Sequence, residues 1–234
     1  MKNKQYTIPV FDIDWTLVHG INFTHSESFK YMFEEVFGLK NINVYDIRPH
    51  GMTDSQIILE ILKIHNLSEG LTKERFETAI KQMGNYYLEN SHKEHIKLMP
   101  GVMNVLNTFK DTGYVMGILS GNIEVVGRQK LSSTLISEYF SFRAFGDMST
   151  SRSELVDFAE KDMQKHGIDA QRSQFVIIGD SMRDIECAMN SNIPSIGVAT
   201  GSYPKEELKR AGADLVVNTL EEIDSIMKFI SSCR

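Results

Sequence analysis

The chain has 234 residues and a formal net charge of −6. This acidic balance argues against nucleic acid and anionic membranes as partners, because both favour a basic protein face. Two cysteines are too few for a disulfide framework, and no apolar run reaches the length of a signal-peptide core or a membrane span. We therefore expect a soluble cytoplasmic protein with one large domain or two unequal ones.

The first predicted strand is the apolar run from Ile8 to Phe11. Asp12 and Asp14 follow it, and Thr16 comes two residues later. A strand that ends in Asp-x-Asp-x-Thr places two carboxylates at the carboxyl edge of a sheet, where α/β folds bind their ligands. Like charges this close raise each other's pKa unless a cation offsets them, so the motif predicts bound Mg²⁺.

Helix-period patterns replace strands between residues 21 and 98. One apolar face repeats at i, i+3, i+4 spacing and ends near Gly38, and Thr72 is a predicted cap of a later helix. Such stripes are typical of packing faces, which predicts an inserted helical domain. The loop and cap before the middle helix either face a ligand or form an ordinary helix entry, and they comprise Arg48, His50, Gly51, Met52 and Thr53.

From Pro100 onward, short strands and helices alternate, which predicts a doubly wound parallel sheet with helices on both faces. The expected strands cover residues 114–119, 142–145, 175–178, 195–198 and 215–217. The expected helices cover residues 102–112, 124–136, 155–166, 184–190, 206–211 and 220–230.

Polar residues follow two of these predicted strands. Ser120, Gly121 and Asn122 offer a hydroxyl and closely approaching backbone amides, which suit phosphoryl oxygens. Asp180 and Asp184 bring further carboxylates to the same sheet edge. Each segment alone is a common turn or helix cap. Their order along the chain, each after a buried strand, predicts a single active site.

These segments together resemble the haloacid dehalogenase-like (HAD) hydrolase superfamily, in particular its phosphoglycolate phosphatase-like branch. The resemblance covers nearly the whole chain and rests on the opening Asp-x-Asp-x-Thr, Leu119-Ser-Gly-Asn122, Arg152-Ser-Glu-Leu155, and Gly179-Asp180 with Asp184. It implies a Rossmann-like α/β core made of residues 1–20 and 97–234. It also implies that residues 21–96 form a helical cap inserted after the first strand.

The resemblance further implies a role for each motif residue. Asp12 would attack phosphorus to form an aspartyl-phosphate, and Asp14 would act as general acid and then general base. Mg²⁺ would bind Asp12, the Asp14 backbone carbonyl and Asp180, while Asp184 orients water or a neighbouring cation. The implied phosphate-binding residues are Trp15, Thr16, Ser120, Gly121, Asn122 and Arg152.

Two positions depart from the family pattern. Trp15 stands where glycine is usual, so we expect its indole at the rim of the site while its backbone amide still binds phosphate. Arg152 replaces the usual lysine and offers a planar fork of donors in place of a point charge. Lys130 is an alternative cation, although its place inside a predicted helix favours a surface lysine.

The implied function is Mg²⁺-dependent hydrolysis of a small phosphorylated metabolite, such as phosphoglycolate or a sugar phosphate, by a monomer or homodimer. A phosphomutase shares the first chemical step and stays an alternative. A 2-haloacid dehalogenase would leave the Asp14 carboxylate and the metal ligands without a purpose. A catalytically inactive binding protein would not need the full set of acidic groups. The sequence leaves the substrate itself open.

Overall fold

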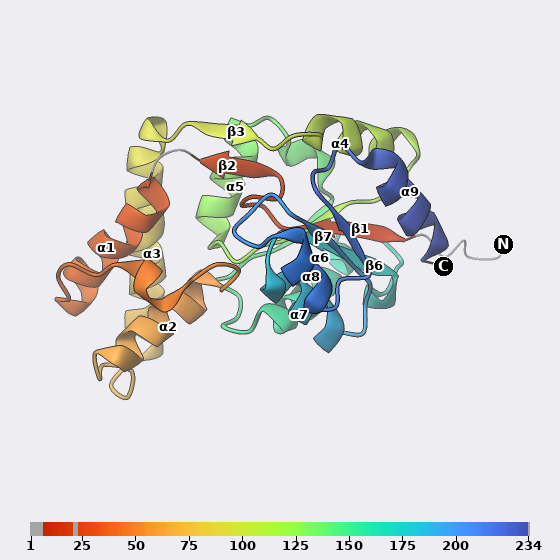
Figure 1. The fold of residues 1–234 in the computed structure, drawn as a ribbon. Helices are drawn as coiled ribbons and strands as arrows, with labels where there is room; N and C mark the ends of the chain where they lie inside the picture. The colour runs from red at the N-terminus through yellow and green to blue at the C-terminus, as the bar shows by residue number, and fades with distance from the viewer. Residues whose placement is uncertain (1–6, 21–22, 234) are drawn as a thin grey trace.

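The computed structural model describes residues 7–20 and 23–233, and at its centre is a six-stranded parallel sheet (Figure 1). The strand order is β5-β4-β1-β6-β7-β8, and neighbouring strands in it pair in parallel. The strands are β1 (Ile8–Phe11), β4 (Gly117–Leu119), β5 (Phe142–Ala144), β6 (Phe175–Gly179), β7 (Ser195–Val198) and β8 (Leu215–Val217). The predicted α/β fold is confirmed.

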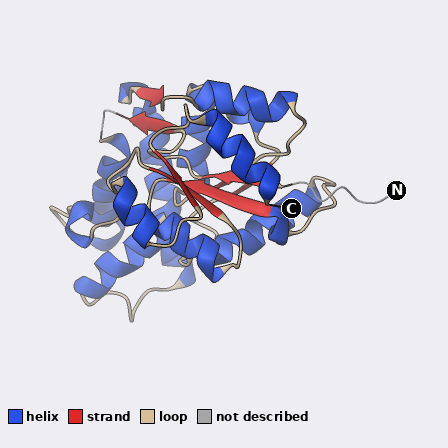
Figure 2. Ribbon diagram, turned by 45° about the vertical axis from the view of Figure 1, so that its right-hand side comes forward, coloured by secondary structure: helices blue, strands red, loops and turns tan. Residues whose placement is uncertain are grey.

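Helices cover both faces of this sheet (Figure 2). Because side chains alternate along a strand, Phe11 packs into one apolar cluster and Val10 into the other. The first cluster includes α4 (Val102–Asp111) and α9 (Ile223–Ser232). The second includes α6 (Leu155–Lys165) and α7 (Met182–Asn190). The short helix α8 (Lys205–Arg210) packs against β7 and β8.

Three helices form the cap: α1 (Thr24–Phe37), α2 (Asp54–Ile64) and α3 (Lys73–Asn90). Their apolar faces meet in a separate cluster, which also takes in Ile123 and Val126 at the start of α5 (Glu124–Ser133). The cap therefore packs against the core through α5. Thr53 and Thr72 accept the expected capping hydrogen bonds, and Gly38 ends α1 at a positive φ of 71°, as predicted.

Two short strands connect the core to the cap, and the sequence did not predict them as strands. The strands β2 (Val18–Gly20) and β3 (Ile96–Leu98) pair antiparallel. They lie at the predicted domain boundary, which stays a prediction, and residues 21 and 22 lie outside the described chain. Three-residue strands carry little periodicity, and their partners are far apart in the sequence. The pairing joins both connections into one ribbon, seen at the top of Figure 1.

Most other differences from the sequence-based expectations concern element ends. The predicted strand from residue 114 begins only at Gly117, and the predicted helix to residue 136 ends at Ser133. Short 3₁₀ helices cover Val44–Ile47, Ser91–Lys93, Ser137–Tyr139, Arg152–Glu154 and Arg172–Gln174. Among the described residues, no helix is both long enough and apolar enough to cross a membrane.

Candidate active site

The candidate site lies at the carboxyl ends of β4, β1 and β6, which are neighbours at the centre of the sheet. Asp12 follows β1, Ser120 follows β4 and Asp180 follows β6. Because the strands are parallel, all three residues leave the sheet at the same edge. The sequence-based prediction of one shared edge is therefore confirmed by the strand order.

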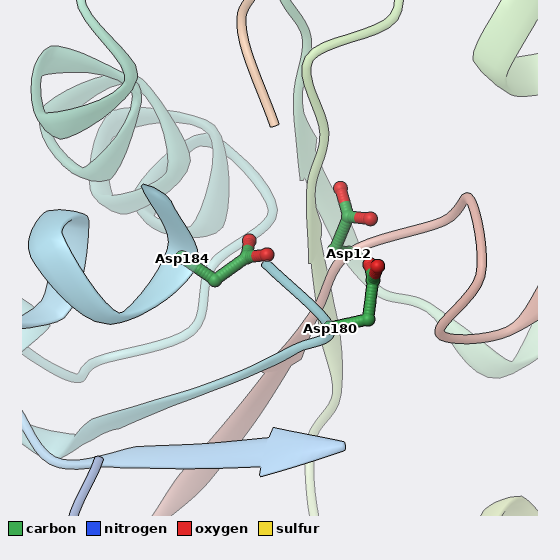
Figure 3. Close-up of side chains that lie close together, drawn as sticks. All are labelled: Asp12, Asp180 and Asp184. Carbon is green, nitrogen blue, oxygen red and sulfur yellow. The ribbon is translucent and has the colours of Figure 1, made fainter. Parts of the chain in front are cut away.

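Three carboxylates converge at this edge. Oxygens of Asp12, Asp180 and Asp184 lie within 4.8 Å of one another, and all three residues are buried. Figure 3 shows Asp184 reaching from α7 toward the strand ends, where the other two side chains stand close together. Burial and nearby acids raise the pKa of Asp12 to about 7, although Arg152 opposes the shift. Burial and the charges of Asp184 and Asp12 likewise raise the pKa of Asp180 well above its usual value.

This donor set fits a divalent cation. Hard cations such as Mg²⁺ prefer carboxylate oxygens, and a cation offsets the repulsion that raises the two pKa values. Asp184 also closes a capping box with Ser181 at the start of α7. Its second oxygen contacts Arg152, which matches its predicted role beside a neighbouring cation.

Arg152 lies inside the acidic cluster. Its Nη2 donates to Asp12 Oδ1 at 2.6 Å and to Asp184 Oδ1 at 2.5 Å, while Nη1 donates to the Gly51 carbonyl at 3.0 Å. Burial lowers the pKa of this guanidinium, but the two carboxylates outweigh it, and the net shift is upward. The guanidinium therefore stays charged, holds the nucleophile candidate in place and contacts the cap.

Lys130 is not a surface lysine, and this part of the sequence interpretation was wrong. The residue is 4% exposed, and its Nζ lies 2.8 and 2.9 Å from the two oxygens of Asp14. A signal for burial existed in the sequence, because the apolar Val126 and the small Gly127, four and three positions earlier, lie on the same side of α5 as Lys130, and both are buried. Burial raises the pKa of Asp14, but the charges of Lys130 and His25 outweigh it, and the net shift is downward.

The two cations therefore serve different acids. Arg152 pairs with Asp12, whereas Lys130 pairs with Asp14. Asn122 supports the second pair, because its Nδ2 donates to Asp14 Oδ2 at 2.7 Å and its Oδ1 accepts from Lys130 Nζ at 3.0 Å. Both cations that the sequence analysis weighed therefore lie in the site, at different carboxylates, and the choice of the one that binds phosphate stays a prediction.

The turn after β1 places Trp15 at the cavity rim, as expected. Trp15 adopts φ 60°, its indole is 44% exposed, and the ring stacks on His19. Its backbone N–H, however, donates to the Val18 carbonyl at 2.7 Å. This amide already donates to an acceptor within the tight turn, which corrects the prediction that it contacts phosphate. The Thr16 hydroxyl lies 3.4 Å from Asp180 Oδ1 and does not line the cavity.

The loop after β4 does line the cavity. Ser120 Oγ accepts from Asn122 Nδ2 at 2.9 Å and keeps its own proton for another acceptor. Gly121 permits a close approach of the cap, because a Cβ there would lie 2.2 Å from the Met52 carbonyl oxygen. Ser120, Gly121 and Asn122 thus lie where the sequence predicted them.

The loop before α2, which the sequence predicted either to face a ligand or to form a helix entry, reaches the site only in part. His50, Gly51 and Met52 line the cavity, whereas Arg48 and Thr53 do not. The Thr53 hydroxyl is used as the cap of α2, at 3.1 Å from the Gln56 amide. Gly51 has φ 76°, and a Cβ there would lie 2.3 Å from Ser181 Oγ. The loop therefore packs closely against the core.

Asp54 is a residue of the cavity lining that the sequence analysis missed. It is 2% exposed, its N–H donates to the Gly121 carbonyl, and its Oδ2 accepts from the Ile123 N–H, both at 2.7 Å. The same carboxylate lies 3.0 Å from His25 Nε2. These bonds join the first turn of α2 to the loop that carries Asn122. As an acid in the first turn of a helix, Asp54 has an ordinary local explanation, and nothing in the sequence distinguishes it.

Core and cap together enclose a cavity of about 330 Å³ that contains Asp12, Asp14, Asp180, Lys130 and Arg152 in its lining. Its volume is in the range of small-molecule sites. A family model described as haloacid dehalogenase-like hydrolase matches residues 9–198. The chain belongs to this family.

The chain is therefore an enzyme of the HAD-like hydrolase family, and it is similar to several proteins with phosphatase names. It is 28% identical over 119 residues to a phosphoglycolate phosphatase from Agrobacterium fabrum, a match that spans 51% of this chain and 50% of that protein. It is 20% identical over 226 residues to a phosphoglycolate phosphatase from Vibrio parahaemolyticus, covering 95% and 96% of the two chains.

Solved structures of HAD-like proteins share the fold. A β-phosphoglucomutase from Clostridium difficile superposes with a TM-score of 0.73 at 20% identity, covering 97% of this chain and 98% of that one. At this identity the similarity establishes the fold alone. In this chain both acids pair with a buried cation: Arg152 pairs with Asp12, and Lys130 pairs with Asp14.

Proposed function

We propose that this HAD-like hydrolase is a Mg²⁺-dependent phosphatase that cleaves a small phosphate monoester through a covalent intermediate on Asp12. The observation that carries the proposal is the arrangement of two carboxylates, each with its own buried cation, around one enclosed cavity. Similar proteins named phosphoglycolate phosphatase support the reaction class.

Asp12 is the nucleophile of this proposal. One of its oxygens attacks phosphorus while the bond from phosphorus to the leaving oxygen breaks, which leaves an acyl phosphate on Asp12. Its Oδ1 accepts a hydrogen bond from Arg152 at 2.6 Å, which fixes the orientation of the carboxylate. The buried guanidinium also offsets negative charge that develops at the phosphoryl oxygens.

Asp14 handles the proton in both steps. It donates a proton to the departing oxygen in the first step, and in the second it takes one from the water that attacks phosphorus. Breaking the bond from phosphorus to Asp12 then restores that carboxylate and releases inorganic phosphate. Lys130 and Asn122 hold Asp14 in the ionised form that the second step requires. The incoming phosphate dianion favours the protonated form that the first step requires, because like charges raise a carboxyl pKa.

Asp12, Asp180 and the backbone carbonyl of Asp14 would hold Mg²⁺, with Asp184 beside them. A bound Mg²⁺ supplies positive charge that stabilises the phosphoryl group in the transition state. The Ser120 hydroxyl, whose proton is free to donate, would bind a phosphoryl oxygen, as would the backbone amides of the same loop.

The test uses a generic aryl phosphate. Purified full-length chain should release inorganic phosphate in the presence of Mg²⁺, lose this activity in chelator and regain it when Mg²⁺ is restored. Full activity in chelator would contradict the metal dependence. A lack of activity with every phosphate monoester would contradict the proposal and favour a catalytically inactive binding protein. Transfer of the phosphoryl group to a second sugar hydroxyl, without release of phosphate, would instead identify a phosphomutase.

Three parts of the sequence-based interpretation stay predictions. These are the cytoplasmic location, the monomeric or dimeric state, and the choice of phosphoglycolate or a sugar phosphate as substrate. The sequence analysis named Arg48 among the loop residues that either face a ligand or form a helix entry, and this residue does not line the cavity. The substrate therefore has to be argued from the residues that do.

A further inference from the structure

The cavity has an aromatic and largely exposed side. Phe23, Tyr45 and Trp15 line it and are 67%, 49% and 44% exposed, respectively. The apolar lining continues inward with Phe29, Val44, Met52 and Ile57. Large rings that remain in contact with water beside a cavity mark a place where an apolar ligand group is buried on binding.

The same cavity has an excess of negative charge. Of the described residues that line it, five carry carboxyl side chains and two carry lysine or arginine side chains, namely Asp12, Asp14, Asp54, Glu94 and Asp180 against Lys130 and Arg152, and His25 lies 3.0 Å from the Asp54 carboxylate. Both cations are already paired with acids of the site. Bound Mg²⁺ and a phosphate dianion would leave this excess unchanged, so a second anionic group on the substrate would lack a partner.

Glu94, like Asp54, is an acid of this lining that lies on the cap side, outside the catalytic cluster. It directly follows the 3₁₀ helix at the end of α3, and it approaches Gly20 of the connecting ribbon. Its carboxylate accepts a hydrogen bond from the Tyr87 hydroxyl. Burial and this carboxylate raise the pKa of the buried Tyr87, so the phenol stays neutral and does not offset the charge of Glu94.

We propose that the substrate is a phosphate monoester whose organic part is uncharged and carries an apolar, planar group of about one ring. This inference rests on the proposed function and names its substrate class. The exposed rings of the lining bind the apolar group, while Glu94 and the other acids of the lining disfavour a second anionic group on the substrate. An engineered apolar cavity of about 150 Å³ holds a benzene molecule. A volume of about 330 Å³ therefore accommodates a phosphoryl group together with one ring.

A matched series of three substrates tests the proposal. Benzyl phosphate and phosphoglycolate both have a CH₂–O–PO₃ group, and they differ in carrying a phenyl ring or a carboxylate on that carbon. Ethyl phosphate is the small uncharged reference. With wild-type chain and Mg²⁺, kcat/KM should be at least about tenfold higher for benzyl phosphate than for ethyl phosphate, because tenfold corresponds to about 1.4 kcal/mol, which burial of a ring-sized group can contribute. Phosphoglycolate should be the poorest of the three, and a kcat/KM equal to or above that of benzyl phosphate would overturn the proposal.

Variants assign the preference to named residues. Phe23→Ala and Tyr45→Ala should each raise the KM for benzyl phosphate severalfold more than the KM for ethyl phosphate. Leu88→Ala is the matched control, because Leu88 is an exposed apolar residue that does not line the cavity. Glu94→Gln keeps an acceptor for Tyr87 but removes the charge, so kcat/KM for phosphoglycolate should rise relative to ethyl phosphate. An unchanged ratio would remove Glu94 from substrate selection.

A binding measurement separates this inference from the proposed function. Benzylphosphonate and phosphonoacetate repeat the same contrast without a cleavable ester bond. Calorimetric titration in Mg²⁺ should show tighter binding of benzylphosphonate by at least about tenfold. If all three esters resist hydrolysis, the proposed function fails, and the ranking of the two phosphonates still decides the inference. Equal or reversed affinities would overturn the inference while leaving phosphatase activity intact.

Discussion

The core side and the cap side of the cavity differ in their charged and exposed residues, although the cap also has a buried acid, Asp54, beside His25. On the core side, Asp12 and Arg152 are buried and paired, and the pair of Asp14 with Lys130 has a buried cation. On the cap side, the apolar ring of Phe23 is exposed to solvent. Paired charges in a dry site have few allowed positions, whereas exposed rings can adjust to a ligand. We therefore expect the core to determine the reaction and the cap to determine which organic group is accepted.

The largest expected effect concerns the nucleophile on the core side. Asp12→Asn keeps the size of the side chain but removes the attacking charge, so turnover should fall at least about a hundredfold. Steady-state kinetics with Mg²⁺ and an aryl phosphate measure this change. Asp224→Asn, which changes an exposed acid of α9, is the control and should leave turnover unaltered. Activity above about a hundredth of wild type in the Asp12 variant would contradict covalent catalysis.

The metal should stabilise the core side in a pH-dependent manner. The pKa of Asp12 is raised from 3.8 to about 7 in the folded metal-free protein. Protonation therefore favours the folded state at low pH, and this contribution is lost as the pH rises from about 4 to about 7. Mg²⁺ can replace the lost proton as a partner of the carboxylate.

Thermal melts with and without Mg²⁺ at pH 5 and pH 8 measure the difference. Saturation at about 100 times Kd contributes about 2.7 kcal/mol, which corresponds to a Tm increase of roughly 5 to 10 °C at pH 8. The increase should be smaller at pH 5, where protons compete for the same carboxylates. Equal increases at both pH values would argue against metal binding by Asp12 and Asp180.

The contact between the two sides depends on Asp54. Asp54→Ala leaves the buried Ile123 N–H without its acceptor, which should lower the free energy of unfolding by about 1–3 kcal/mol. Urea unfolding measures this loss. Asp54→Asn retains an oxygen acceptor and should recover most of the stability. If the alanine variant were as stable as wild type, the contact between α2 and the Asn122 loop would contribute nothing to the free energy of unfolding.

The smallest effect is expected at Lys130. Lys130→Met removes the partner of Asp14, so the pKa of Asp14 should rise and kcat should fall about tenfold, because the matching of acid and base strength is lost. The rising limb of the kcat profile should move to higher pH. Lys63→Met is a matched control, since Lys63 makes an ion pair of the same 2.8 Å length on the exposed surface. An unshifted pH profile would separate Lys130 from the proton transfers of Asp14.

Sequence patterns predicted the core side better than the cap side. The strand before Asp12 is a run of four buried residues, and the strand before Asp180 is equally apolar, so both were recognisable from their neighbours. The cap helices were recognisable too, because their apolar faces repeat with helical period and Thr53 and Thr72 cap them as expected. The residues that line the cavity from the cap were predicted only in part: Arg48 and Thr53 do not line it, and Thr53 caps α2, as the alternative of a helix entry predicted.

By itself, the sequence determined the α/β order of elements, the strand ends that carry the acids and the presence of a helical insertion. These features depend on residues two to four positions apart, which a local pattern records. Tertiary structure alone decided that Lys130 pairs with Asp14, 116 positions away, and that Asp54 meets Ile123, 69 positions away. It also decided that β2 pairs with β3. Such contacts depend on how whole elements pack, and no single segment of the sequence determines the free energy of that packing.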